Sequence, residues 1–228
     1  MTIRILSSKA PAPLLARLVT ELGAEPAAQG GADDVVADAA GGVDVEQQVA
    51  SGAGVDVVVL ASGAIERLAA QGHVLPEPQE LVLATEAVVA VADGSSRMAG
   101  ADGADLPDVS TPEALRAAVE RARAVGISTG PSGDAVRRIL DAWGLADRTV
   151  VAPPGVPVGS MLADGTADLV VQQRTELEGM TGVAVVGPLP GDLALTSRFV
   201  GAVVSASDQP EAAAAVLAGI ARLARSSD

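Results

Sequence analysis

Four segments of the sequence join the end of an apolar run to the start of a helical pattern through small or hydroxyl-bearing residues. These segments are Ser7, Ser8 and Lys9; residues 39–42; residues 61–63; and residues 127–133. A turn without bulky side chains exposes the backbone N–H groups at the start of the following helix, where the helix dipole adds partial positive charge. The chemistry that these segments indicate is the binding of an anion.

The fourth segment carries the clearest helical signal. Val136, Ile139, Leu140 and Trp143 recur at i, i+3, i+4 and i+7, which predicts one apolar helix face, and Gly144 follows as a stop. A glycine-rich turn of this kind can also be a tight connection that binds nothing. The repetition of the arrangement along the chain favours the binding interpretation.

The rest of the sequence alternates strands with helices. Strands are predicted at residues 3–6, 35–36, 55–60, 80–92, 125–128, 149–152, 167–173, 183–186 and 193–205. Helices are predicted at residues 13–22, 43–50, 111–125 and 159–164, around Ile65, around Val136 and after Pro210. This alternation predicts an α/β fold with parallel sheets, in which ligands bind at the carboxyl ends of the strands.

Two long apolar stretches predict that the chain crosses between two lobes. Residues 80–92, with a break near Thr85 and Glu86, would cross into the second lobe, and residues 193–205 would cross back. Lobe one is therefore expected to comprise residues 1–85 and 193–228, and lobe two residues 86–192. Residues 24–34 and 93–108 are predicted to be loops, and no internal repeat is strong enough to use. Two crossings form a hinge, about which lobes can close around a ligand.

Composition excludes several classes of function. With 29 acidic residues against 15 basic ones and 1% aromatic residues, the chain lacks the basic stripe and stacking platforms of nucleic-acid-binding proteins. No Cys and a single histidine, His73, argue against zinc sites and a Ser-His-Asp triad. No apolar run is long enough for membrane insertion, and the start of the sequence lacks a signal-peptide pattern. The sequence as written therefore predicts a cytoplasmic protein, and a periplasmic or extracellular protein is the alternative if a signal peptide was removed.

Several long segments resemble bacterial solute-binding proteins of the type 2 periplasmic-binding-protein fold, near the molybdate-binding branch. The most specific are STGPSGDAVRRILDAWGL at residues 128–145 and PPGVPVGSMLADGTADLVVQQRTEL at residues 153–177, supported by residues 55–74 and 185–193. The resemblance implies two lobes, each a mostly parallel sheet flanked by helices, joined by two crossing strands that act as a hinge. It also implies a small anion between the lobes and, for an exported protein, a transporter permease as partner.

Carried residue by residue, the resemblance implies a set of ligand-binding positions at the turns. They are Ser7, Ser8, Lys9, Gly41, Gly42, Ser62, Ser128, Thr129, Ser132, Gly133, Val158, Gly159, Gln172 and Gln173. Successive strand residues point to opposite faces, so one of the two glutamines is expected to reach the ligand, and Gln173 is favoured. Arg174 could clamp a carboxylate or lie on the surface, and Lys9 has the same two interpretations.

The Gln-Gln-Arg end of the late strand, where molybdate-binding proteins commonly carry a tyrosine, resembles a branch that includes aconitate isomerase. An isomerase of a small unsaturated polycarboxylate is therefore the alternative to a binding protein. It would need a base near an acidic C–H group, for which Lys9, Glu86 and Asp134 are the candidates, and no cofactor or metal. Asp134 and Glu86 also have structural interpretations, as a first-turn helix acid and as a hinge contact. A cytoplasmic sensor that a partner protein reads is a third hypothesis.

Overall fold

The computed structural model describes residues 2–24, 34–94, 98 and 106–226. The chain forms two compact units: unit 1 comprises Met1–Ala84 and Arg198–Asp228, and unit 2 comprises Thr85–Ser197. The sequence placed these boundaries after residues 85 and 192. Most of the two loops expected at residues 24–34 and 93–108 lies outside the described residues.

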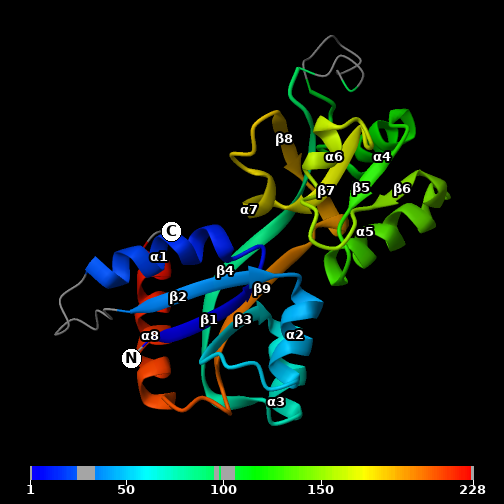
Figure 1. The fold of residues 1–228 in the computed structure, drawn as a ribbon. Coiled ribbons are helices and arrows are strands. Elements are labelled where there is room, and N and C mark those ends of the chain that lie inside the picture. Colours follow the sequence, from blue (N-terminus) through cyan, green and yellow to red (C-terminus); the bar gives the residue numbers. More distant parts are fainter. Residues whose placement is uncertain (1, 25–33, 95–97, 99–105, 227–228) are drawn as a thin grey trace. The chain divides into compact units, whose positions relative to one another are not determined.

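Unit 1 is built from alternating strands and helices (Figure 1). Its elements are β1 (Ile3–Ser8), α1 (Ala12–Ala24), β2 (Val35–Ala40), α2 (Gly42–Ala50), β3 (Val57–Ala61), α3 (Ser62–Ala70), the first part of β4 (Val74–Ala92), β9 (Thr196–Val204) and α8 (Pro210–Ser226). The strand order is β2-β1-β3-β9. β1 is parallel to β2 and to β3, whereas β9 is antiparallel to β3.

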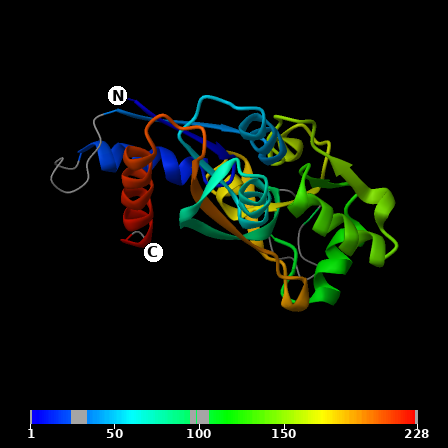
Figure 2. The ribbon, with the colours of Figure 1, turned by 90° about the horizontal axis from the view of Figure 1, so that it is seen from below.

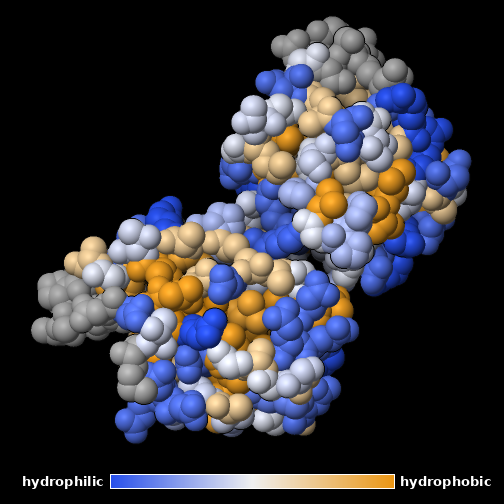
Figure 3. All heavy atoms as spheres, viewed as in Figure 1, coloured by the Kyte–Doolittle hydropathy of each residue, from blue (hydrophilic) through white to orange (hydrophobic). Residues whose placement is uncertain are grey.

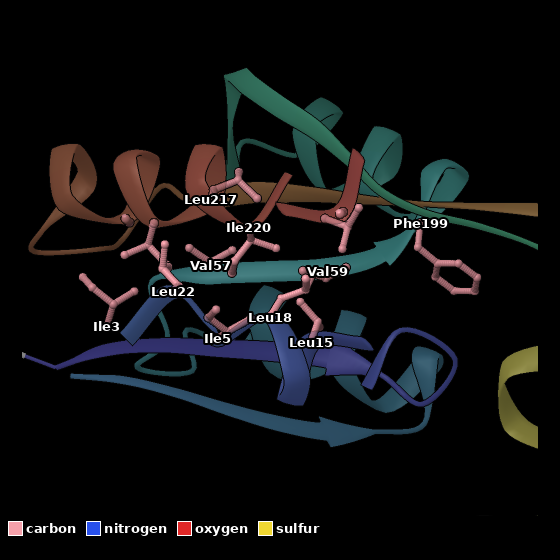
Figure 4. Packing of buried hydrophobic residues seen from close by; sticks show 14 of the residues in the cluster. Ile3, Ile5, Leu15, Leu18, Leu22, Val57, Val59, Phe199, Leu217 and Ile220 are labelled. Atoms are coloured by element: carbon pink, nitrogen blue, oxygen red, sulfur yellow. The ribbon is translucent and has the colours of Figure 1, made fainter. Parts of the chain in front are cut away.

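Helices cover both faces of the unit 1 sheet. On one face, the buried leucines of α1 and α8 pack against Ile5, Val57 and Val59 of β1 and β3 (Figure 4). α1 and α8 lie side by side in both ribbon views (Figures 1 and 2). On the other face, α2 and α3 cover Val58 and Leu60 of β3. A sheet buried on both sides explains the continuous apolar run of β3.

Unit 2 repeats this architecture. Its elements are the remainder of β4, α4 (Pro112–Arg121), β5 (Val125–Ile127), α5 (Pro131–Ala142), η3 (Ala146–Arg148), β6 (Thr149–Val151), α6 (Ser160–Ala163), β7 (Leu169–Gln173), α7 (Arg174–Leu177), β8 (Val183–Pro188) and η4 (Gly191–Leu193). β5 is parallel to β6 and to β7, and β4 is antiparallel to β7 and to β8. One face packs against α4 and α5, and the other against α6 and α7.

The two units share a strand order, since β6-β5-β7-β4 matches β2-β1-β3-β9. A buried aspartate marks the correspondence. Asp56 precedes β3 and accepts a hydrogen bond from the backbone N–H of Arg4 at 2.9 Å. Asp168 precedes β7 and accepts one from the backbone N–H of Arg123 at 2.8 Å. Each carboxylate therefore ties the beginning of the third parallel strand to its neighbour, at the edge opposite the helix starts.

Three elements differ from the sequence predictions. β2 continues through Ala39 and Ala40, which were expected to form a turn, and β4 runs without a break for 19 residues. α4 ends at Arg121 rather than near residue 125. β2 lies at a sheet edge, where Val36 is exposed, and Figure 3 shows hydrophobic residues (orange) at the surface along this strand. An exposed edge strand of small residues lacks the apolar pattern by which strands are recognised.

Candidate functional site

The carboxyl ends of the three parallel strands of unit 1 lie at one edge of its sheet. Ser8 pairs in register with Ala40, and Ser7 pairs with Ala39 on β2 and with Val59 on β3. α2 and α3 begin directly after β2 and β3, so their first turns lie at this edge too. The structure therefore brings together the segments that the sequence singled out in the first lobe.

The hydroxyl of Ser8 is a buried polar group at this edge. Ser8 is 7% exposed, and its Oγ finds no hydrogen-bond partner within the described residues. The Cβ of Ser8 lies 3.7 Å from the point where a Cβ on Gly42 would stand, so Ser8 lies against the start of α2. Ser7 is already engaged, because its hydroxyl donates to the carbonyl oxygen of Ser8 at 3.0 Å. Lys9 is half-buried and takes part in an interaction.

The starts of α2 and α3 have no side-chain caps. Gly41 and Ala61 occupy the N-cap positions and make no capping bond. α4 contrasts with them, because its N-cap residue Thr111 accepts a hydrogen bond from the backbone N–H of Ala114. An uncapped first turn leaves N–H groups without an acceptor, which an anion can supply.

The two uncapped starts differ in charge. The carboxylate of Asp44 lies beside Gly41, 2.7 Å from the position of an added Cβ, and supplies negative charge to α2. α3 begins at Ser62 and has no acidic residue in its first turn. The start of α3 is therefore the more electropositive of the two.

Arg67 lies near the start of α3 and was missed by sequence reasoning. Its Nη1 lies 3.7 Å from the position of an added Cβ on Gly63, in the first turn of α3. Its Nε and Nη2 donate to Glu46 of α2, each at 2.7 Å, and this hydrogen bonding raises the pKa of Arg67 above its usual value. The spacing of Gly63 and Arg67, one helical turn, was the available signal.

Unit 2 presents a similar edge. Ile127 pairs in register with Val151 on β6 and with Val171 on β7, so the three parallel strands end together. β5 leads into Ser128 and Thr129, which are followed by the start of α5. The expected helix is confirmed at Pro131–Ala142.

The turn before α5 needs glycine at two positions. Gly130 has φ 98°, in the region that side-chain-bearing residues avoid. A Cβ on Gly133 would stand 1.9 Å from the carbonyl oxygen of Ser128, so the strand end packs directly on the first turn of α5. Ser132 is half-buried, with its Oγ 3.5 Å from the Oγ of Ser128, and Thr129 is exposed. Like α2 and α3, α5 has no side-chain cap.

Core packing occupies the side chain of Val158 and the space next to the Cα of Gly159. Val158 is buried in the core cluster that α6 and α7 cover. A Cβ on Gly159 would stand 2.7 Å from the sulfur of Met180 and 3.1 Å from Leu177 Cδ2. Only the backbone N–H groups of these two residues are therefore suited to a ligand.

The two glutamines at the end of β7 lie in different environments. Gln172 uses both ends of its amide: its Nε2 donates to Glu176 at 3.3 Å, and its Oε1 accepts the backbone N–H of Gln173 at 3.0 Å. Gln173 is 2% exposed and its Nε2 donates to Ser197 at 2.8 Å. Its Oε1 has no partner within the described residues, so Gln173 keeps an unused polar atom.

The candidate bases are unevenly suited to proton transfer. Arg174 donates from Nε and Nη2 to Oε1 of Glu86, at 3.1 and 2.7 Å, so Glu86 is engaged in an ion pair. Asp134 is exposed in the first turn of α5.

No cluster of possible metal ligands occurs among the described residues. Within the same residues, no helix has the length and apolar character needed to span a membrane.

The fold and these edges define the class of protein: a two-lobed α/β protein of the type 2 periplasmic-binding-protein fold. The chain belongs to the family described as bacterial extracellular solute-binding protein, whose model matches residues 3–221. The resemblance and the fold class expected from the sequence are both confirmed.

Known proteins share the sequence or the fold. The chain is 34% identical to an aconitate isomerase from a Pseudomonas species over 166 residues, which are 71% of this chain and 60% of that protein. The molybdate-binding protein of Azotobacter vinelandii matches with 18% identity and a TM-score of 0.72, covering 97% of each chain. The sulfate-binding protein of Mycobacterium tuberculosis matches with 16% identity and a TM-score of 0.73, covering 97% of this chain and 82% of the other.

Proposed function

We propose that the protein is a solute-binding protein for a small anion, an organic carboxylate or an oxyanion, held at the carboxyl edges of the parallel strands. One observation carries the proposal. α2, α3 and α5 follow parallel strands and start without a side-chain cap, whereas α4, which follows the antiparallel strand β4, is capped by Thr111. The amides left open at the three starts suit an anion.

The neighbouring side chains can donate hydrogen bonds to an anion, so the site does not need a positively charged side chain that neutralises the whole charge of the anion. Ser8, with its unused Oγ, lies beside Gly42, and the hydroxyl of Ser132 lies in the first turn of α5. Hydrogen bonds to a charged group are roughly twice as strong as those between neutral groups. The net charge of −14 does not prevent this, because exposed charges more than about 10 Å away are largely screened by salt.

The structural neighbours and the family named above both support this proposal. The molybdate- and sulfate-binding proteins share the fold and bind oxyanions, and the family implies a solute as ligand. In this proposal a transporter permease is the partner of an exported form. The cytoplasmic location expected from the sequence stays a prediction.

Calorimetric titration checks the proposal. We expect the protein to bind at least one of molybdate, sulfate, citrate, cis-aconitate and trans-aconitate, and Ser8→Ala to weaken that binding by about tenfold, because one hydrogen bond to a charged group is lost. Ser51→Ala is the matched control, since Ser51 is exposed at the end of α2 and its hydroxyl donates to Gln47. Absence of binding to all five anions would contradict the proposal.

A second function is proposed on one specific observation, the 34% identity to aconitate isomerase. In that reaction a base removes a proton from a carbon next to the double bond. The electron pair shifts the double bond, and a proton returns to the other end of the three-carbon unit. Lys9 and Asp134 remain base candidates, while the ion pair with Arg174 leaves Glu86 less suited.

Proton NMR in D2O separates catalysis from binding. An isomerase is expected to convert cis-aconitate to trans-aconitate, or to exchange its acidic C–H protons for deuterium, at a rate proportional to protein concentration. A binding protein broadens the ligand signals without converting the ligand or exchanging its C–H protons. Absence of conversion and of exchange under saturating ligand would exclude the isomerase function for aconitate.

A further inference from the structure

The start of α2 combines several hydrogen-bond donors with one acceptor, all within unit 1. The backbone N–H groups of its first turn are donors without a side-chain cap, because Gly41 stands at the N-cap position. The side chain of Asp44 folds back over this position, and its Oδ2 lies 2.7 Å from the point where a Cβ on Gly41 would stand. Among the residues that the structure describes, no donor bonds to this carboxylate. Asp44 therefore keeps its hydrogen-bonding capacity for another partner.

Ser8 lies between the two uncapped helix starts of unit 1. It stands at the end of β1, which pairs with β2 on one side and with β3 on the other, so the starts of α2 and α3 flank it. Neighbouring strands lie about 4.8 Å apart, which places the ends of β2 and β3 about 10 Å from each other. A small ligand that bonds to the buried, unpartnered Oγ of Ser8 is therefore within reach of both helix starts.

The two helix starts offer different partners to that ligand. α3 has no acidic residue in its first turn, so its open amides suit an anionic group. Asp44 places a carboxylate at the start of α2, and an ionised carboxylate only accepts hydrogen bonds. An anionic group of the ligand would be repelled there, whereas a hydroxyl or an ammonium group would be bound. Unit 1 by itself thus favours a carboxylate that also carries a hydrogen-bond donor.

We propose that Asp44 is a specificity-determining residue of the anion site, and that the ligand is a small carboxylate with a hydrogen-bond-donating substituent, a hydroxyl or an ammonium group, next to the carboxylate. This inference rests on the proposed function, because it describes the anion of the same site. The substituent donates to Asp44 at the start of α2. The carboxylate of the ligand accepts hydrogen bonds from the amides of α3 and from the hydroxyl of Ser8.

An acidic residue in a first turn can also stabilise its helix without binding a ligand, and Glu113 of α4 provides the control for this role. Glu113 is exposed in the first turn of α4, as Asp44 is in the first turn of α2. α4 follows the antiparallel strand β4 and is capped by Thr111, so the proposed site does not use its start. Glu113→Ala removes the same charge as Asp44→Ala.

The experiment compares three acids that differ in one substituent. Succinate carries a hydrogen, malate a hydroxyl and aspartate an ammonium group at the same carbon. Succinate and both enantiomers of the other two are titrated calorimetrically at neutral pH into the wild type, Asp44→Ala, Asp44→Asn and Glu113→Ala. We expect malate or aspartate to bind the wild type about tenfold or more tightly than succinate, since one hydrogen bond to a charged group is gained. Asp44→Ala should reduce this preference to about threefold or less, and Glu113→Ala should keep it.

Asp44→Asn distinguishes the two substituents. The amide oxygen of asparagine still accepts a hydrogen bond from a hydroxyl, but it lacks the charge that pairs with an ammonium group. A preference for malate should therefore survive in part in Asp44→Asn, whereas a preference for aspartate should fall as far as it does in Asp44→Ala.

The outcomes separate the inference from the function on which it rests. If succinate binds the wild type as tightly as malate and aspartate do, or if Asp44→Ala keeps the preference, the inference is overturned and anion binding stands. The same holds if the wild type binds one of the five anions titrated above and none of these acids. An equal loss in Glu113→Ala would show a net-charge effect and also overturn the inference. If neither these acids nor the five anions bind, the proposed function fails and the inference fails with it. Thermal midpoints check folding, and the preference measured in Asp44→Asn decides the question if Asp44→Ala does not fold.

Discussion

Ser132→Asp is expected to reduce anion affinity by about a hundredfold or more, because it places a like charge within about 4 Å of the bound anion. Ser132 is the second residue of α5, half-buried next to Ser128. The same substitution adds an acid to the first turn of a helix, which favours folding by about 0.3–1 kcal/mol. Anion affinity should therefore fall while the free energy of unfolding rises. Calorimetric titration and urea denaturation of one sample can measure the two quantities.

The control for this substitution lies on the same helix. Ala142 is the exposed last residue of α5, so Ala142→Asp adds an equal charge at the opposite helix end. It should leave affinity unchanged and lower the free energy of unfolding slightly, since an acid opposes the dipole there. Equal affinity in wild type and Ser132→Asp would place the anion away from the start of α5.

Gly133→Ala is expected to destabilise unit 2 by about 3 kcal/mol, at the upper end of overpacking effects. The added methyl group would stand 1.9 Å from the carbonyl oxygen of Ser128, a backbone atom that cannot rotate away. Relief requires α5 to move from the end of β5, which would also disturb the amides of its first turn. Urea denaturation should show a lower midpoint, and anion affinity should fall in the same variant.

Gly54→Ala provides the comparison for this prediction. An added Cβ on Gly54 meets no atom within 4 Å, so the free energy of unfolding should stay nearly constant or rise slightly. A Gly133→Ala protein as stable as the wild type would mean that the first turn of α5 does not pack on Ser128 as described.

The fold was predictable where side-chain patterns are strong. β3, buried on both faces, appears as a continuous apolar run, and α5 appears as a periodic face that ends at a glycine. β2 and the short helix α7 were less predictable, because an exposed edge strand of small residues and a four-residue helix carry little periodicity. The continuous β4 was predicted in part only, since the alternation near Thr85 and Glu86 resembles a break.

The repeated strand order was not visible in the sequence. Asp56 and Asp168 stand at corresponding places, each directly ahead of an apolar run of five residues in β3 and three in β7. Two matching aspartates in a chain with 29 acidic residues are too weak a signal to define a repeat.

The candidate site was predictable in its backbone and less so in its side chains. Small and hydroxyl residues at strand ends located the helix starts, since those positions follow from local pattern alone. The partners of Arg67 and Arg174 lie 21 and 88 residues away in the sequence, so their orientation depends on tertiary structure. Gln172 and Gln173 are the same residue type at adjacent positions, and their contacts in the structure distinguish them.

The crossing strands also determine the order in which the protein can fold as it is synthesised. Unit 2 is one continuous segment, Thr85–Ser197, so β5, β6, β7 and β8 are synthesised before most of β9 and before α8. Unit 1 has β1, β2 and β3 early, but its fourth strand and the apolar face of α8 arrive last. Ile5, Leu18 and Val59 share a core cluster with α8, so they lack this part of their packing until the last segment of the chain is synthesised. Apolar surface that is exposed during folding favours aggregation, so the early part of unit 1 is the part that is exposed to this risk for longest.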